Sequence, residues 1–127
     1  MSQYFDLGDE TLWNPSNGVS RLFQHHVAVF ETELGLPSGI GPMADDACQI
    51  VPDTFEVFVE ALLARHRRTS HAVALALSEG FVATVLVLAE RAAIEVDWAR
   101  PGTAPEGGAS GVGLREMTRE LGRRMPR

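Results

Sequence analysis

Residues 72–89 read AVALALSEGFVATVLVLA, a stretch in which Glu79 is the one charged residue and Gly80 the one glycine. A segment this long and apolar nearly all round predicts a helix that other elements cover on most sides. Thr69 or Ser70 can cap it. A glycine inside a helix costs about 1 kcal/mol relative to alanine, so we expect Gly80 either to break the helix or to pack closely against another backbone.

The bulk properties are those of one packed domain. The chain has 127 residues, of which 45% are hydrophobic and 22% charged, and a domain of this size needs no metal or disulfide to fold. Cys48 is the single cysteine, and the acids near it count against a nucleophilic thiol, which leaves a small buried residue. The first residues lack the basic and apolar regions of a signal peptide, so we expect a cytoplasmic protein.

Two amphipathic helices are predicted before the central segment. The first spans residues 19–34, after turn and capping residues at 14–16. The second begins at Asp53, with Glu56 as its capping-box partner, and runs to residue 68. Because only these two substantial helices are available to cover the apolar segment, we expect a second copy of the chain to cover the rest of it in a homodimer.

Shorter elements are predicted at both ends of the chain. Residues 3–13 have the pattern of a β-hairpin or an extended arm, and residues 35–52 form a long loop of a kind that is uncommon without a function. Residues 99–111 have the composition of a flexible linker before a short amphipathic helix at 112–127. The predicted fold is therefore mainly α, a compact bundle of three principal helices over residues 1–98 with a tethered C-terminal helix.

Charge is distributed unevenly along the chain. The first sixty residues hold about ten acids against one base, and the remainder about seven acids against ten arginines. A net charge of -6 argues against nucleic-acid binding, which depends on basic residues that neutralise phosphates. A membrane partner is not expected either, because Glu79 in hydrocarbon would cost on the order of 3 kcal/mol.

An acid–base site is conceivable around Glu79. A carboxylate in an apolar helix must be paired, protonated or exposed at a cleft, and such a group can act as a general acid or base. If the chain is an enzyme, His66 and His71 are its partners. A metal held by His26, His66, His71 and Glu79 is also conceivable, although the sequence has none of the paired metal-binding motifs. The simpler interpretation is that Glu79 reaches solvent or pairs with an arginine such as Arg67 or Arg68, so no catalytic residue, metal ligand or cofactor is assigned.

Two polar clusters are candidate ligand-binding sites. Trp13, Asn14 and Asn17 belong to an elbow before the first helix, where backbone amides could bind an anion or a peptide carboxylate. Asp45 and Asp46 lie in the long loop, where their carboxylates could serve a ligand. Helix capping and loop solubility account for the same residue types.

Three segments resemble those of a small actinobacterial family of domains of unknown function. They are TLWNPSNGVSRLF at 11–23, GLPSGIGPMADDACQI at 35–50 and SEGFVATVLVLAERA at 78–92. The resemblance covers the first ninety-odd residues and leaves the tail outside. It implies a compact, mostly helical, cytoplasmic protein and carries over no catalytic residue.

Three functions remain open from the sequence. The leading hypothesis is a non-catalytic, homo-oligomeric binding or adaptor protein that recognises a protein, peptide or small ligand through the elbow, the 35–52 loop and the central helix. The alternative is an enzyme of specialised metabolism with an apolar pocket, in which Glu79 and a histidine act as acid and base or as metal ligands. A third is a regulatory partner whose acidic body covers a basic protein surface.

Overall fold

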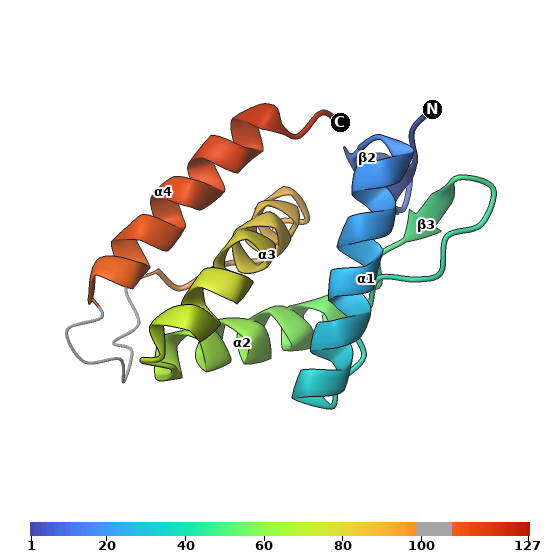
Figure 1. The fold of residues 1–127 in the computed structure, drawn as a ribbon. Helices are drawn as coiled ribbons and strands as arrows, with labels where there is room; N and C mark the ends of the chain where they lie inside the picture. Colours follow the sequence, from blue (N-terminus) through green and yellow to red (C-terminus); the bar gives the residue numbers. More distant parts are fainter. Residues whose placement is uncertain (99–107) are drawn as a thin grey trace.

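The protein is a mainly α fold with a small sheet at its N-terminal end (Figure 1). A computed structural model describes the backbone of residues 1–98 and 108–127, and the side chains of 1–98 and 113–127. The elements in chain order are β1 (Tyr4–Leu7), β2 (Glu10–Trp13), α1 (Asn17–Leu34), β3 (Ala47–Gln49), α2 (Pro52–Arg68), α3 (Ala72–Arg91) and α4 (Gly108–Arg124). The predicted class, with an N-terminal hairpin and a C-terminal helix, is confirmed.

Helix α3 lies in the middle of the fold and is continuous through Gly80. In Figure 1, α1 and α4 lie on either side of it. The close backbone contact predicted for Gly80 is wrong, because a Cβ at this position would meet no atom within 4 Å. The helix is long and apolar enough to cross a membrane by length and composition alone, and 44% of its most apolar window is buried inside the protein. A core helix passes the same test.

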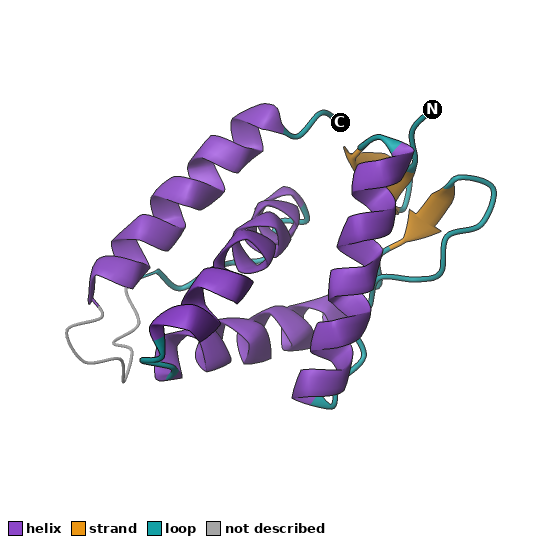
Figure 2. Cartoon of the chain, viewed as in Figure 1, coloured by secondary structure: helices purple, strands orange, loops and turns teal. Residues whose placement is uncertain are grey.

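The sheet is larger than the predicted hairpin. Strand β1 pairs antiparallel with β2 and parallel with β3, in the order β2-β1-β3, and Figure 2 shows the strands gathered at one end of the molecule. Strand β3 lies inside the segment 35–52, so the prediction of an uninterrupted loop there is wrong. Its three residues are too few for an alternating pattern, and the pairing of buried Cys48 with buried Phe5 defines the strand.

Two helix starts differ from the prediction. Helix α2 begins at Pro52 without a side-chain cap, so the capping box of Asp53 and Glu56 is not formed. Proline has the φ angle that the first residue of a helix requires, so the helix starts at Pro52, one residue before the predicted Asp53. Helix α4 begins at Gly108, ahead of the predicted start at 112, because each residue added to an existing helix gains a hydrogen bond. The earlier part of the linker predicted at 99–111 lies outside the described residues.

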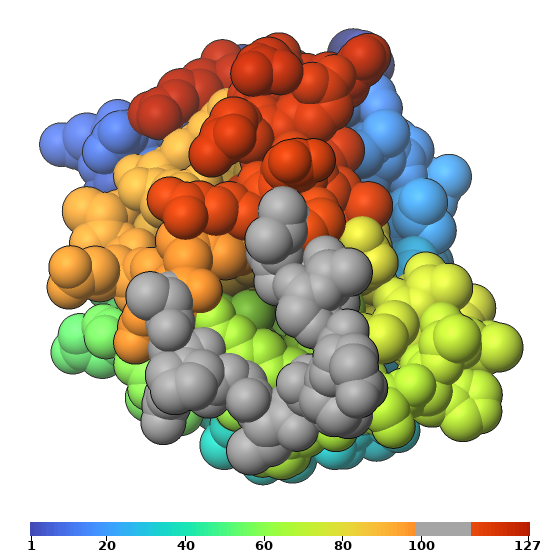
Figure 3. All heavy atoms as spheres, turned by 90° about the vertical axis from the view of Figure 1, so that its left-hand side faces the viewer, coloured from blue at the N-terminus to red at the C-terminus, as the bar shows by residue number. Residues whose placement is uncertain are grey.

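Helix α4 packs on α3 and is fastened at its C-terminal end by Arg91. Figure 3 shows α4 lying over the second half of α3. The Arg91 guanidinium donates to the backbone carbonyls of Leu12 at 2.8 Å, Gly122 at 2.8 Å and Met125 at 2.9 Å. One cation thus joins β2, α3 and the C-terminal residues, and it bonds carbonyls at the end of α4 that the helix itself leaves free.

Candidate functional site

A cavity of about 450 Å³ opens between the elbow after β2, helices α1 and α3, and the C-terminal residues. It is termed the elbow cavity. Its lining residues are Trp13, Pro15, Ser16, Val19, Leu22, Phe23, His26, Gly80, Phe81, Thr84, Leu121, Arg124, Met125 and Pro126. The structure therefore brings together the elbow and the central helix, two of the three predicted binding elements. The 35–52 loop contributes no residue to this described lining.

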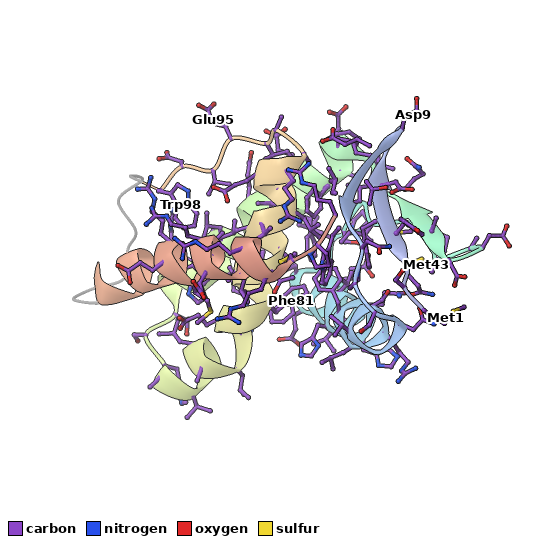
Figure 4. All side chains as sticks on the ribbon, turned by 90° about the horizontal axis from the view of Figure 1, so that it is seen from above. Met1, Asp9, Met43, Phe81, Glu95 and Trp98 are labelled. Carbon is purple, nitrogen blue, oxygen red and sulfur yellow. The ribbon has the colours of Figure 1, made fainter. Side chains whose placement is uncertain are left out.

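Aromatic rings form the buried wall of the elbow cavity. The Trp13 and Phe23 rings meet edge to face at 5.2 Å, and Phe23 lies 5.6 Å from Phe81. Phe81 also stacks on Phe30 at 4.8 Å and on His26 at 5.9 Å. Figure 4 shows Phe81 between α3 and α1. Because packed aromatic rings are rigid, this wall exists before any ligand binds.

The mouth of the elbow cavity carries exposed apolar side chains. Val19 is 49% exposed and Leu22 58%. Gly80 leaves further space on the opposite side, since no atom lies within 4 Å of where its Cβ would be. Exposed apolar groups bordering a concave site are typical of a surface that contacts a ligand or partner.

The polar groups in the described lining of the elbow cavity are basic or uncharged. His26 and Arg124 are the ionisable side chains of its described lining. Nδ1 of His26 lies 2.9 Å from the carbonyl oxygen of Leu22, which can only accept, so Nδ1 donates this hydrogen bond. Arg124 pairs with Glu120 at 3.0 Å. This described lining contains no carboxylate.

Trp13 lines the elbow cavity, whereas Asn14 and Asn17 are engaged by their own chain. The Asn14 backbone N–H donates to the carbonyl of Pro126 at 2.7 Å, and its side-chain amide donates to the carbonyl of Gln3 at 3.0 Å. The Asn17 N–H is bonded to an N-terminal carbonyl at 3.2 Å. These amides hold both chain ends on the elbow, and a ligand-binding role for the two asparagines stays a prediction.

Asp45 and Asp46 form a tight turn. Their φ angles are 52° and 63°, and the flanking residues Ala44 and Ala47 exchange backbone hydrogen bonds of 2.9 and 3.1 Å. Two successive left-handed residues are the geometry of a type I′ turn, which Asp tolerates better than most residues. The turn explains the pair, and neither residue belongs to the described lining of the elbow cavity.

A second cavity, of about 250 Å³, lies between α1, α2 and the first half of α3. It is termed the His66 cavity. Its lining residues are Val29, Phe30, Glu33, Leu62, Arg65, His66, Thr69, Ala74, Leu77, Ser78 and Val82. His66 is 4% exposed, and neither of its ring nitrogens has a hydrogen-bond partner. Nη1 of Arg65 is buried without a partner as well.

Of the three acid–base candidates, His66 alone belongs to the described lining of either of these two cavities. Burial lowers the pKa of His66, the charge of Glu79 acts in the opposite direction, and that of Arg67 adds to the lowering. The ring is therefore neutral at neutral pH. Glu79 is half-buried and is absent from the described linings of both cavities. Its effect on His66 is electrostatic, through the charge of its carboxylate.

His71 has a structural role in the fold. Its Nδ1 accepts a hydrogen bond of 3.4 Å from the backbone N–H of Ala74, as the N-cap of α3. The prediction that Thr69 or Ser70 caps this helix is therefore wrong, since a histidine one residue further on supplies the acceptor. In the described part of the chain, no three His, Cys, Asp or Glu side chains gather as a metal site requires, so the set of His26, His66, His71 and Glu79 does not form one there.

Cys48 is an inert core residue, as predicted. Its side chain is 4% exposed. Burial, assisted by the charge of Asp6, raises the pKa of the Cys48 thiol to about 12. The thiol is therefore protonated at neutral pH, and the thiolate that acts as a nucleophile is not formed.

The chain belongs to a family of unknown function (DUF6086), which matches it over residues 1–127. The match includes the tail that the resemblance of three segments left outside, so α4 and the C-terminal wall of the elbow cavity lie within the family. No curated protein and no solved structure matches the chain. The function must accordingly be inferred from the geometry of the two cavities.

Proposed function

We propose that this member of the family is a non-catalytic binding protein that holds an apolar group of a protein, peptide or small-molecule partner in the elbow cavity. The observation that carries the proposal is the cavity itself, which has a volume of about 450 Å³. A wall of buried rings and exposed Val19 and Leu22 at the mouth give it the character of a preformed apolar site. His26 and Arg124 can bond a polar end of the partner.

The second part of the proposal is a homodimer. Val29, Val73 and Leu77 are 55%, 59% and 76% exposed, and all three lie on α1 or on the first half of α3. A second copy that covers these side chains would bury apolar surface that one chain leaves in water. A closed two-fold contact would also use the same surface on both copies.

An enzyme remains the alternative. The buried, neutral ring of His66 is the kind of perturbed group that active sites contain. Glu79 and His71 are not in the described lining of its cavity, and an acid–base mechanism needs a second group within reach of a substrate. A cytoplasmic location, an actinobacterial origin and the lack of nucleic-acid and membrane partners stay predictions from the sequence.

The elbow cavity is tested with the uncharged apolar dye Nile red and the substitution Gly80→Leu. A Cβ at Gly80 meets no atom within 4 Å, so a leucine can enter the cavity without displacing the backbone. We expect dye affinity, measured by fluorescence titration, to fall roughly tenfold or more, which is at least about 1.4 kcal/mol.

Two variants control this experiment. Gly80→Ala adds a methyl group and should reduce dye affinity far less than leucine does. Ala76→Leu places the same leucine on an exposed part of α3 outside the described lining of both cavities. Equal dye binding by the wild type and Gly80→Leu would contradict the proposed use of the elbow cavity.

A further inference from the structure

Three buried polar atoms without partners belong to two residues that line the His66 cavity. They are Nη1 of Arg65 and both ring nitrogens of His66. Buried polar groups in folded proteins are nearly always hydrogen-bonded, because their water is lost and must be replaced. A cavity lined by Arg65 and His66 is the place from which a ligand could supply the missing partners.

The guanidinium of Arg65 is fixed on one side and unbonded on the other. Its Nη2 donates to Glu33 at 3.2 Å, and its central carbon lies 5.8 Å from the centre of the Phe30 ring. These two contacts leave Nη1 buried and without a partner. Since a guanidinium is always charged and only donates, the group that suits Nη1 is an acceptor, and an anionic oxygen bonds it most strongly.

The remainder of the lining is mostly apolar. Phe30, Leu62 and Val82 contribute buried or half-buried side chains, and Leu77 stands at the exposed edge. A volume of about 250 Å³ lies below the range of roughly 300–1,000 Å³ that is usual for drug-sized ligands. The ligand must therefore be small, with one polar end and one apolar end.

We propose that the His66 cavity binds a small carboxylic acid with an apolar tail, whose carboxylate accepts hydrogen bonds from Arg65 Nη1 and from His66. The apolar tail would occupy the side of the cavity formed by Phe30, Leu62 and Val82. This site is separate from the elbow cavity, because the stacked rings of Phe30 and Phe81 lie between the two.

Binding of the carboxylate is coupled to a proton on His66. In the free protein burial keeps the ring neutral, so it offers one donor, whereas the imidazolium offers two. The charged groups around the ring are Glu33 from α1, Arg65 and Arg67 from α2, and Glu79 from α3. Glu33 is paired with Arg65, so a bound carboxylate adds a net negative charge and raises the proton affinity of the ring.

The sign of the pH dependence follows from this coupling. The pKa of His66 is lowered in the free protein and is raised by the bound anion, so the complex takes up a proton between the two values. Affinity is therefore greatest below that interval and falls as pH rises through it, by at most about tenfold per pH unit.

Calorimetric titration with phenylacetate tests the site, with uncharged phenylacetamide as the matched ligand. We expect the wild type to bind phenylacetate at least roughly tenfold more tightly than the amide, and Arg65→Met and His66→Leu each to weaken it at least tenfold. In ¹⁵N spectra of the wild-type protein at pH 7, the ring nitrogens of His66 should shift toward the protonated form when phenylacetate is added.

Several results would overturn the proposal. They are a wild type that binds the amide as well as the acid, variants that bind phenylacetate unchanged, or a ring that phenylacetate does not shift. His66→Leu removes the two unbonded nitrogens and should fold, and the wild-type spectra do not depend on any variant. Gly80→Leu should leave phenylacetate binding intact, so failure of this site is distinguishable from failure of the elbow cavity.

Discussion

The two halves of α3 are both rich in apolar residues and have different surroundings. In the second half, Phe81–Ala89, eight side chains are buried under α2, α4 and β2. In the first half, residues 72–80, Val73 is 59% and Leu77 76% exposed, and Figure 3 shows this yellow-green part clear of α4. Hydropathy thus predicts which surface favours burial, whereas the topology decides how much of it one chain can bury.

The largest expected effect on stability comes from comparing the same substitution, leucine to alanine, in the two halves of α3. Leu88 in the second half is fully buried, and Leu88→Ala should lower the free energy of unfolding by about 3 kcal/mol through lost burial and a cavity. Leu77→Ala in the first half should change it by less than about 0.5 kcal/mol in dilute solution. Urea denaturation of both variants measures the difference. Similar losses for the two would show that the first half is covered as well as the second.

A smaller effect is expected from removing the cation that fastens α4 over the second half. Arg91→Met deletes three hydrogen bonds to backbone carbonyls, and we expect a loss of about 2 kcal/mol. Arg91→Lys keeps the charge without the planar fork and should lie between methionine and the wild type. Hydrogen exchange should become faster in α4 before the rest of the fold. Amides of α4 that stay protected in Arg91→Met would contradict this role.

Much of the fold could be predicted because its signals are long. The largely apolar run of residues 72–89 predicts α3, and the helical spacing over 19–34 predicts α1. The strand Ala47–Gln49 could not be found in this way, because three residues hold no periodic pattern and their pairing with β1 is decided in three dimensions. Helix boundaries were least certain for the same reason, as the starts at Pro52 and Gly108 show.

The candidate site was predictable only in part. The elbow at Trp13 and the central helix were identified, but the C-terminal wall depends on contacts between chain ends, such as that of Asn14 with Pro126. Gly80 was expected to mark a close contact and instead borders open space. Arg65 lies in the last turn of α2, where cations are common, and its buried nitrogen results from packing against α1, which no local pattern encodes.

The smallest effect on stability is expected from a charge placed on the uncovered half. Because Leu77 is 76% exposed, Leu77→Glu should leave the unfolding of the isolated chain nearly unchanged. In a homodimer that covers this surface, the same glutamate would be desolvated without a partner, so the dimer should dissociate. Sedimentation velocity at micromolar concentration distinguishes the two states.

The matched control for that measurement is Val57→Glu, which adds the same charge to a residue of α2 that is 54% exposed and lines neither described cavity. It should sediment as the wild type does. A wild type that is monomeric at this concentration would remove the dimer from the proposed function. The first half of α3 would then be a helix surface whose apolar side chains remain in water, as part of the apolar surface of every folded protein does.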